Sequence, residues 1–98
     1  MTHRKIPDGA RIILASDLLS REIDNELVIL NLRDGIYYGL EDVGARVWSL
    51  LQKPVTFAVI RETLLAEYSV DRDRCDEDLR RLLADLETRG LIVVEDPG

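Results

Sequence analysis

Two strand-like segments separated by an Asp-Gly pair constrain the fold of this chain more than any other feature. Residues 26–32 are aliphatic and β-branched, a composition that favours a strand. Glycine tolerates the positive φ of a tight turn, so Asp34-Gly35 predicts a hairpin that returns through residues 36–40. A further apolar run at 11–15 follows the turn signal Pro7-Asp8-Gly9. The first half of the chain is therefore predicted to be an antiparallel meander of three strands.

The second half of the chain has the spacing of three helices. Apolar residues between 42 and 52 recur at helical intervals and predict the first helix. Thr56 is predicted to cap a second helix and Asp71 a third. The third helix carries one apolar stripe at positions i, i+4, i+7, i+8 and i+11, formed by Cys75, Leu79, Leu82, Leu83 and Leu86. Gly90 is predicted to end this helix, and residues 91–94 to form a short strand or a tail packed on the core.

This order of elements predicts an α+β fold similar to a winged helix-turn-helix, with a three-stranded antiparallel sheet followed by three helices. A chain of 98 residues suits one domain with one core. We therefore expect a single domain over residues 1–98, with an ordered core at about 10–93.

Charge and composition exclude several classes of function. The net charge is -6, and the arginines of the predicted third helix alternate with acids, which argues against binding to nucleic acid. No apolar run is long enough to span a bilayer, and the N-terminus lacks the apolar stretch of a signal peptide. We therefore expect a cytoplasmic protein without a membrane partner.

The sequence offers few groups for catalysis or metal binding. His3 lies near the N-terminus without an evident partner, and we expect it to be solvated. Cys75 follows Arg74 near a helix start, which favours a reactive thiol, but its place on the apolar stripe favours packing. The acids at 71–78 lack the central glycine and terminal glutamate of a calcium loop. We expect no enzyme activity, no catalytic residue, no cofactor and no metal site.

Aromatic residues mark the strand that follows the hairpin. Tyr37 and Tyr38 are adjacent, so their side chains point to opposite faces of the predicted sheet. One of them should face the core and the other solvent, where an aromatic side chain could contact a peptide. The pattern leaves open which tyrosine does which. Trp48 lies in a helical apolar pattern and is expected in the core.

Several segments resemble, in the same order, the PqqD-type family. The resemblance covers about residues 10–93, nearly the whole chain. Its most specific parts are the Tyr-Tyr-Gly-Leu sequence after the hairpin and the Gly-Ala-x-x-Trp sequence that follows it. The segments are residues 27–32, 34–40, 43–51, 55–56, 64–71, 82–86 and 90–92.

The resemblance implies a recognition element for ribosomally made, post-translationally modified peptides. A free-standing chain of this size looks most like the leader-binding proteins of lasso-peptide biosynthesis. Its expected partners are a precursor (leader) peptide, a leader peptidase of the cysteine-protease type and an ATP-dependent macrocyclase. The resemblance further implies that the leader pairs antiparallel with the third strand and lies in the cleft between that strand and the third helix.

The physics of an edge strand agrees with this implied mode. The last strand of a meander leaves backbone N–H and C=O groups unpaired, and an extended peptide can satisfy them. Part of the helical stripe must pack the core, and Arg80 and Arg81 either are solvated or pair with acidic leader residues. The expected peptide-binding residues are Asp34, Gly35, Ile36, Tyr37, Tyr38, Gly39 and Leu40 from the strand side, and Cys75, Leu79, Arg80, Leu82, Leu83 and Leu86 from the helix side.

Three alternatives stay open at this point. The nearest is a PqqD-type chaperone that delivers a precursor peptide to a radical enzyme. A DNA-binding winged helix would need a basic recognition helix, whereas the predicted third helix carries about as many acids as bases. An enzyme with Cys75 as nucleophile would need a base, and His3 is the one histidine of the sequence.

Overall fold

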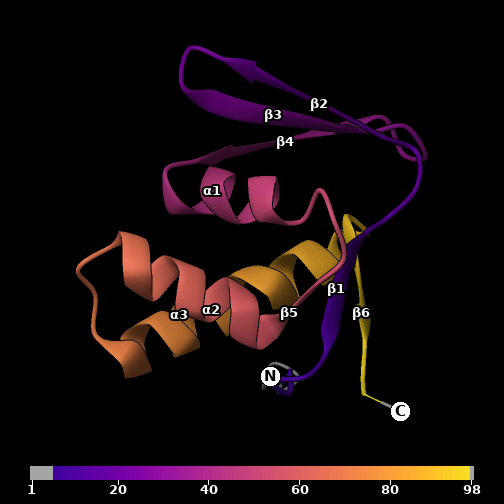
Figure 1. Ribbon diagram of the computed structural model, residues 1–98. Helices are drawn as coiled ribbons and strands as arrows, with labels where there is room; N and C mark the ends of the chain where they lie inside the picture. The colour runs from indigo at the N-terminus through magenta and orange to yellow at the C-terminus, as the bar shows by residue number, and fades with distance from the viewer. Residues whose placement is uncertain (1–5, 98) are drawn as a thin grey trace.

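The computed structural model describes residues 6–97, so His3 lies outside the described residues. Strands and helices follow one another in an α+β fold, as expected (Figure 1). The elements are β1 (Arg11–Leu14), β2 (Leu18–Ile23), β3 (Glu26–Asn31), β4 (Ile36–Glu41), α1 (Val43–Leu50), β5 (Val55–Thr56), α2 (Phe57–Glu67), α3 (Arg72–Thr88) and β6 (Ile92–Glu95).

The predicted meander exists, but its first strand is β2 and not the run at 11–15. Strands β2, β3 and β4 form a three-stranded antiparallel sheet in that order. The β2–β3 connection is a two-residue turn in which Asp24 and Asn25 have φ of 49° and 68°. Asp and Asn tolerate this left-handed conformation better than other non-glycine residues, which makes them suitable for a primed hairpin turn. The β3–β4 connection contains Gly35 at φ 73°, as the hairpin prediction requires.

The run at 11–15 belongs to a second sheet. Strand β1 lies between β5 and β6 and pairs antiparallel with both. Asp17, at φ 62°, lies in the short connection that takes the chain from this sheet to the meander. The segment predicted at 91–94 is therefore a strand and not a tail, with the bounds Ile92–Glu95. This second sheet lies at the end of the molecule away from the meander (Figure 1).

The three predicted helices are confirmed, with their caps. The Thr56 side chain accepts a hydrogen bond from the backbone N–H of Val59, and the Asp71 side chain accepts one from that of Arg74. Each bond satisfies a donor that the first turn of a helix leaves free. Gly90 follows α3 with φ 74°, the left-handed conformation expected of a C-terminal stop.

The core lies between the meander, the helices and the second sheet. Trp48 is 2% exposed, which confirms its prediction as a core residue. The core also includes Ile6 and Val94, which lie just outside the range 10–93. In the meander, Leu27 and Ile29 of β3 point inward, and their cross-strand partners Leu40 and Tyr38 pack against the same core.

A buried arginine ties the start of the described chain to the helices. The Arg61 side chain, from α2, is 9% exposed and donates hydrogen bonds to Asp8 and Asp76, each at 2.9 Å. Arg80 binds Asp76 at 2.7 Å and also donates to the Ile6 carbonyl. Hydrogen bonding to Arg61 lowers the pKa of Asp8 below its ordinary value, because it favours the charged carboxylate. The cluster fixes the segment before β1 against α2 and α3.

Candidate functional site

Strand β4 is an open edge of the meander. It pairs with β3 along its whole length, and in the described part of the chain no strand pairs with its other side. Across this free side lies the C-terminal half of α3, so that Tyr38 and Leu40 share a cavity with Asp85 and Arg89. The unpaired backbone N–H and C=O groups of an edge strand can form hydrogen bonds with an added strand. The site therefore offers main-chain hydrogen bonds along one wall and side chains along the other.

A cation–π contact marks the β4 end of this cavity. The Arg89 guanidinium lies 5.1 Å from the centroid of the Tyr38 ring and is held by Asp85 at 3.0 Å. Tyr38 thus faces the core side of the sheet, whereas Tyr37 points to the opposite face and is 67% exposed. Tyr38 is therefore the tyrosine that faces the cleft.

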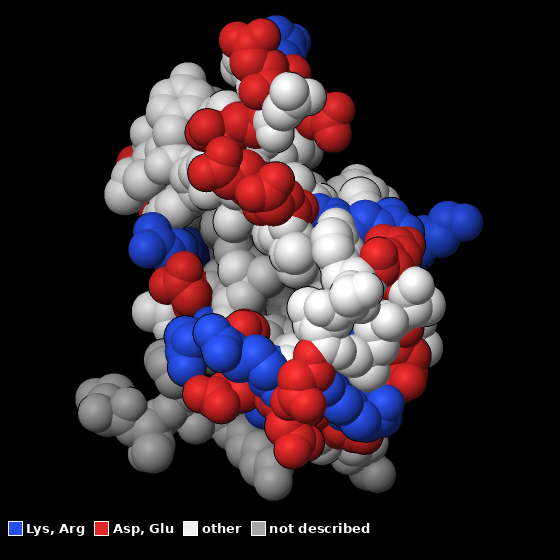
Figure 2. Space-filling model, turned by 90° about the vertical axis from the view of Figure 1, so that its left-hand side faces the viewer, with Lys and Arg blue, Asp and Glu red and all other residues white. Residues whose placement is uncertain are grey.

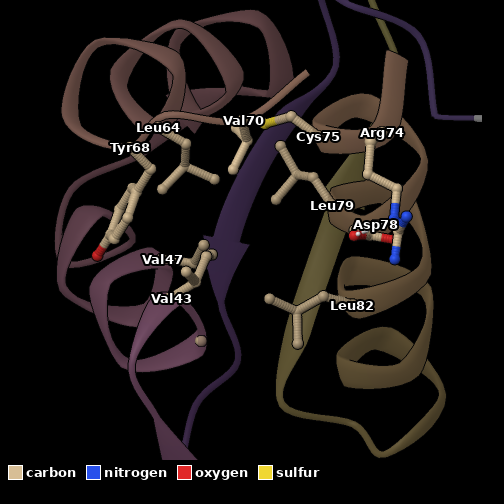
Figure 3. A pocket seen from close by; sticks show the side chains of 11 residues that line it. Val43, Val47, Leu64, Tyr68, Val70, Arg74, Cys75, Asp78, Leu79 and Leu82 are labelled. Atoms are coloured by element: carbon tan, nitrogen blue, oxygen red, sulfur yellow. Dashed lines mark hydrogen bonds and ion pairs between the residues drawn. The ribbon is translucent and has the colours of Figure 1, made fainter. Parts of the chain in front are cut away.

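A second, more apolar cavity continues the site toward the start of α1. It has a volume of about 270 Å³ and lies between α1, the end of α2 and the first half of α3 (Figure 3). Aliphatic side chains of α1 face those of α3 across it, and the Arg74–Asp78 ion pair, at 3.2 Å, lies at its rim. The lining residues are Val43, Gly44, Val47, Leu64, Tyr68, Val70, Arg74, Cys75, Asp78, Leu79 and Leu82.

The two cavities share α3 as their common wall. Asp78 and Leu82 line the apolar cavity next to α1, and Asp85 and Arg89 line the cavity next to β4. Their spacing of four, three and four residues places all four on one face of a helix. We call the combined site the groove: β4 and the start of α1 on one side, and this face of α3 on the other. Figure 2 shows a hollow with an uncharged floor, acidic side chains above it and mixed charges below.

The structure brings most of the predicted site residues to the groove. Tyr38, Gly39 and Leu40 line its β4 part together with Leu86, and Tyr37 borders this part although its side chain points to the other face of the sheet. Cys75, Leu79 and Leu82 line its apolar part. Asp34, Gly35 and Ile36 lie at the hairpin that leads into β4. The Asp34 side chain accepts a hydrogen bond from the Ile36 N–H at 2.9 Å, which stabilises this turn.

Two predicted residues lie elsewhere. Leu83 is fully buried in the core. Arg80 points away from the groove: it is bound by Asp76 and its guanidinium lies 4.2 Å from the centroid of the Phe57 ring. The structure therefore does not place Arg80 where it would meet an acidic leader residue. Arg81 is exposed and pairs with Glu77 at 3.0 Å on the outer face of α3.

Sequence reasoning missed several groove residues. Asp85 and Arg89 lie on the polar side of the apolar stripe, and their i+3 and i+7 spacing from Leu82 could have identified them. Val43 and Val70 are exposed apolar residues at the start of α1 and just before α3. No local pattern distinguishes them from core residues, because their exposure depends on how the helices pack.

The electrostatics of the site oppose the nucleophile and the DNA-binding alternatives. Burial raises the pKa of the Cys75 thiol, and the neighbouring Asp76 raises it further, so the reactive thiolate is disfavoured. Each arginine of α3 is paired with a carboxylate, which leaves no free basic row for phosphates.

The acids considered for calcium are used in other ways. Asp71 caps α3, Asp76 binds Arg61 and Arg80, and Glu77 binds Arg81. Within residues 6–97, no group of three or more potential metal ligands occurs. No helix in the same range is long and apolar enough to cross a membrane.

Fold and groove together define a class: a small winged-helix-like α+β domain with an open strand edge facing a helix. The family described as "Coenzyme PQQ synthesis protein D (PqqD)" matches residues 26–92, and this chain belongs to that family. The resemblance noted in the sequence is thereby confirmed.

Two solved structures are similar to this chain. One, described as "TbiB1 in Complex with the TbiA(beta) Leader Peptide", is 40% identical, with a TM-score of 0.77 over 82% of this chain and 93% of that one. The other, described as "Lasso peptide synthetase B1 complexed with the leader peptide", shares the fold at 24% identity, with a TM-score of 0.71 over 84% of this chain and 96% of that one. No curated protein matches the chain.

Proposed function

We propose that this protein binds the leader region of a ribosomally synthesised precursor peptide in lasso-peptide biosynthesis. The leader adds to the free edge of β4 as an antiparallel strand and lies in the groove against α3. The observation that carries the proposal is the open β4 edge with a helix across it. The relative at 40% identity, whose description names a complex with a leader peptide, supports it.

Strand addition supplies affinity, and the groove supplies selectivity. Main-chain hydrogen bonds depend little on the peptide sequence, so side-chain pockets must distinguish one leader from another. The apolar cavity next to α1 suits an aliphatic or aromatic leader side chain, because aliphatic residues of three helices line it. Arg89 and Asp85 offer a donor and an acceptor at the β4 end of the groove.

The protein acts without catalysis in this proposal, as a cytoplasmic module. It holds the leader while a leader peptidase of the cysteine-protease type and an ATP-dependent macrocyclase modify the rest of the precursor. A bound leader raises the local concentration of the precursor at its enzymes, an effect that needs no chemistry from the binding module.

The family match favours one second candidate. Because the family is described by coenzyme PQQ synthesis, this second candidate is a chaperone that delivers a precursor peptide to a radical enzyme. The same groove would serve both functions. The two candidates differ in the peptide that binds, so a competition between a lasso leader and a PQQ precursor peptide distinguishes them.

The test is a titration of the purified protein with the synthetic leader encoded beside it, followed by NMR of the backbone amides. We expect saturable binding, with the largest shift changes in residues 36–41 and along the groove face of α3. The amides of β4 that face the free edge should also become protected from hydrogen exchange. A folded protein that does not bind the leader, or that binds it with shifts confined to β1 and β6, would contradict the proposal.

A further inference from the structure

The turn between β3 and β4 contacts the C-terminal end of α3. Arg33 lies in this turn, and its guanidinium donates a hydrogen bond to the carbonyl oxygen of Gly90, 57 residues further along the chain. Figure 1 shows the turn and the end of α3 on the same side of the molecule. Strand β4 begins just after the turn, and α3 ends just before Gly90. The hydrogen bond therefore joins the two opposite walls of the groove at one end.

The Arg33 side chain is itself held in place by a buried residue. Asn31, which is 2% exposed, accepts hydrogen bonds through its Oδ1 from the Arg33 backbone N–H at 3.0 Å and from the Arg33 Nε at 3.4 Å. A planar guanidinium with two anchors is fixed in direction more strictly than a flexible ammonium with one. Arg33 thus connects the end of β3 to the end of α3.

The end of α3 suits this cation. The last carbonyl groups of a helix lack partners within the helix and carry a partial negative charge. Within its bounds α3 has no basic residue in its last turn, and Arg89, which follows, lies over Tyr38. Gly90 also permits the close approach, because a Cβ at this position would lie 3.3 Å from a guanidinium nitrogen of Arg33. Arg33 therefore supplies, from another segment, the charge that the helix end favours.

Arg89 makes a second contact between the same walls, in the reverse direction. It extends from the end of α3 to the ring of Tyr38 on β4, at 5.1 Å, and Asp85 holds it at 3.0 Å. An arginine from each wall thus contacts the other wall at the same end of the groove. We call Arg33 and Arg89, with their partners, the clasp. At the opposite end of β4 the chain continues through Asp42 into α1, which borders the apolar cavity.

An added strand needs the two walls at one separation, and this step rests on the proposed function. A strand that pairs with β4 lies about 4.8 Å from it, because the ladder hydrogen bonds fix this spacing. Its inward side chains then pack on α3 only if α3 keeps its distance from β4. A groove with walls that move apart must be ordered again at each binding event, which lowers the affinity.

We propose that Arg33 is a positioning residue for leader binding, because the clasp holds β4 and α3 at the separation that the peptide requires. Arg33 acts through the β3–β4 turn and the Gly90 carbonyl, and it makes no contact with the peptide. Without the clasp contact of Arg33, the protein stays folded with an intact β4 edge, but the width of the groove varies. The leader then binds the fraction of molecules with the right width, and the apparent affinity falls by that fraction.

Three variants separate this role from a loss of charge. Arg33→Ala removes the side-chain contacts of Arg33 and leaves the groove residues unchanged. Arg33→Lys keeps the positive charge, but an ammonium lacks the planar group that binds Asn31 and the Gly90 carbonyl together. Arg81→Ala is the matched control, because it removes the same charge from an exposed arginine that pairs with Glu77 on the outer face of α3.

Three measurements are made on each variant. Affinity for the synthetic leader encoded beside this chain is measured by fluorescence anisotropy, and the free energy of unfolding by urea titration. The groove itself is followed by fluorine NMR of protein labelled with 3-fluorotyrosine. The chain has three tyrosines, Tyr37, Tyr38 and Tyr68, so three resonances are expected, and each is assigned by a Tyr→Phe substitution.

Arg33→Ala should bind the leader about five- to tenfold more weakly than the native protein, and Arg33→Lys about threefold more weakly. Arg81→Ala should stay within about twofold of native, as for an exposed ion pair. In free Arg33→Ala the Tyr38 resonance should shift or broaden, because Arg89 no longer keeps its place over the ring, while the Tyr68 resonance stays at its native position. Saturating leader should return the Tyr38 resonance to that of the native complex, since the bound peptide then joins both walls.

Several outcomes would overturn the inference. Native leader affinity in folded Arg33→Ala, or a loss no larger than that of Arg81→Ala, would do so and leave the proposed function standing. Weaker binding with an unchanged Tyr38 resonance would also do so, because Arg33 would then contact the leader directly. If Arg33→Ala does not fold, Arg33→Lys decides: native affinity together with a native Tyr38 resonance contradicts the positioning role. A native protein that does not bind leader would remove the proposed function, and this inference with it.

Discussion

A proline scan of the two sheet edges tests strand addition most directly. Tyr37 and Tyr38 are consecutive on β4, and consecutive residues of an edge strand point their N–H groups in opposite directions. One N–H therefore serves the ladder to β3, and the other faces the free edge. Proline removes the N–H, so substituting each tyrosine in turn removes one donor on each side.

The expected magnitude follows from the geometry. β4 has six residues, so about three N–H groups face the free edge. Loss of one donor costs about 0.5–1.5 kcal/mol, and the proline ring also displaces the peptide strand locally. A total of about 1–3 kcal/mol corresponds to a roughly 5- to 150-fold weaker leader affinity. The variant that loses a ladder bond should instead show a lower free energy of unfolding.

The other edge of the same sheet supplies the control. Ser20→Pro and Arg21→Pro on β2 remove donors from a strand that also has one free side. Folding of all four variants is checked by circular dichroism and thermal unfolding, and leader binding by fluorescence anisotropy. Folded variants at Tyr37 and Tyr38 that both bind leader with native affinity would refute addition at β4. Loss confined to the β2 variants would move the peptide to the other edge.

Three further predictions concern residues that stabilise the fold around the groove. Asp8→Asn should lower stability at neutral pH, and this loss should shrink as pH falls below about 4, because hydrogen bonding to Arg61 lowers the pKa of Asp8. The contribution of Asp8 is present above its unfolded pKa and disappears as pH falls through its lower folded pKa. Urea unfolding at several pH values measures this, and equal losses at all pH values would contradict it. Cys75 should react with iodoacetamide at least about tenfold more slowly in the folded protein than in urea, because burial raises its pKa. Gly35→Ala should cost about 1 kcal/mol, since φ is 73° there while the added Cβ meets open space; an unchanged unfolding midpoint would contradict this account.

The sequence predicted the elements that depend on local signals. The Asp34-Gly35 turn, the caps at Thr56 and Asp71 and the stop at Gly90 all appear as expected, because each depends on the conformation of a few neighbouring residues. Strand β2 was missed because its local sequence carries no such signal. Five of its six residues are exposed, so it lacks the buried alternation that identifies a strand.

Which strands form the second sheet depends on pairing between segments that lie far apart in the sequence. Ile12 pairs with Val55 on one side and Val94 on the other, and no local pattern predicts partners that far apart. Arg80 illustrates the same limit for the site. Its neighbours on the helix suggested the groove, but its partners Asp8 and Phe57 come from other segments and hold it on the opposite side.

The second sheet has a practical consequence for handling the protein. Arg11 pairs with Glu95 across β1 and β6, and Gly9 lies near Pro97, so the two ends of the described chain lie close together (Figure 1). They do so at the end away from the meander. A tag, a fluorophore or a whole enzyme can therefore be attached at either end, or this unit inserted into a host loop, with the β4 edge still pointing outward.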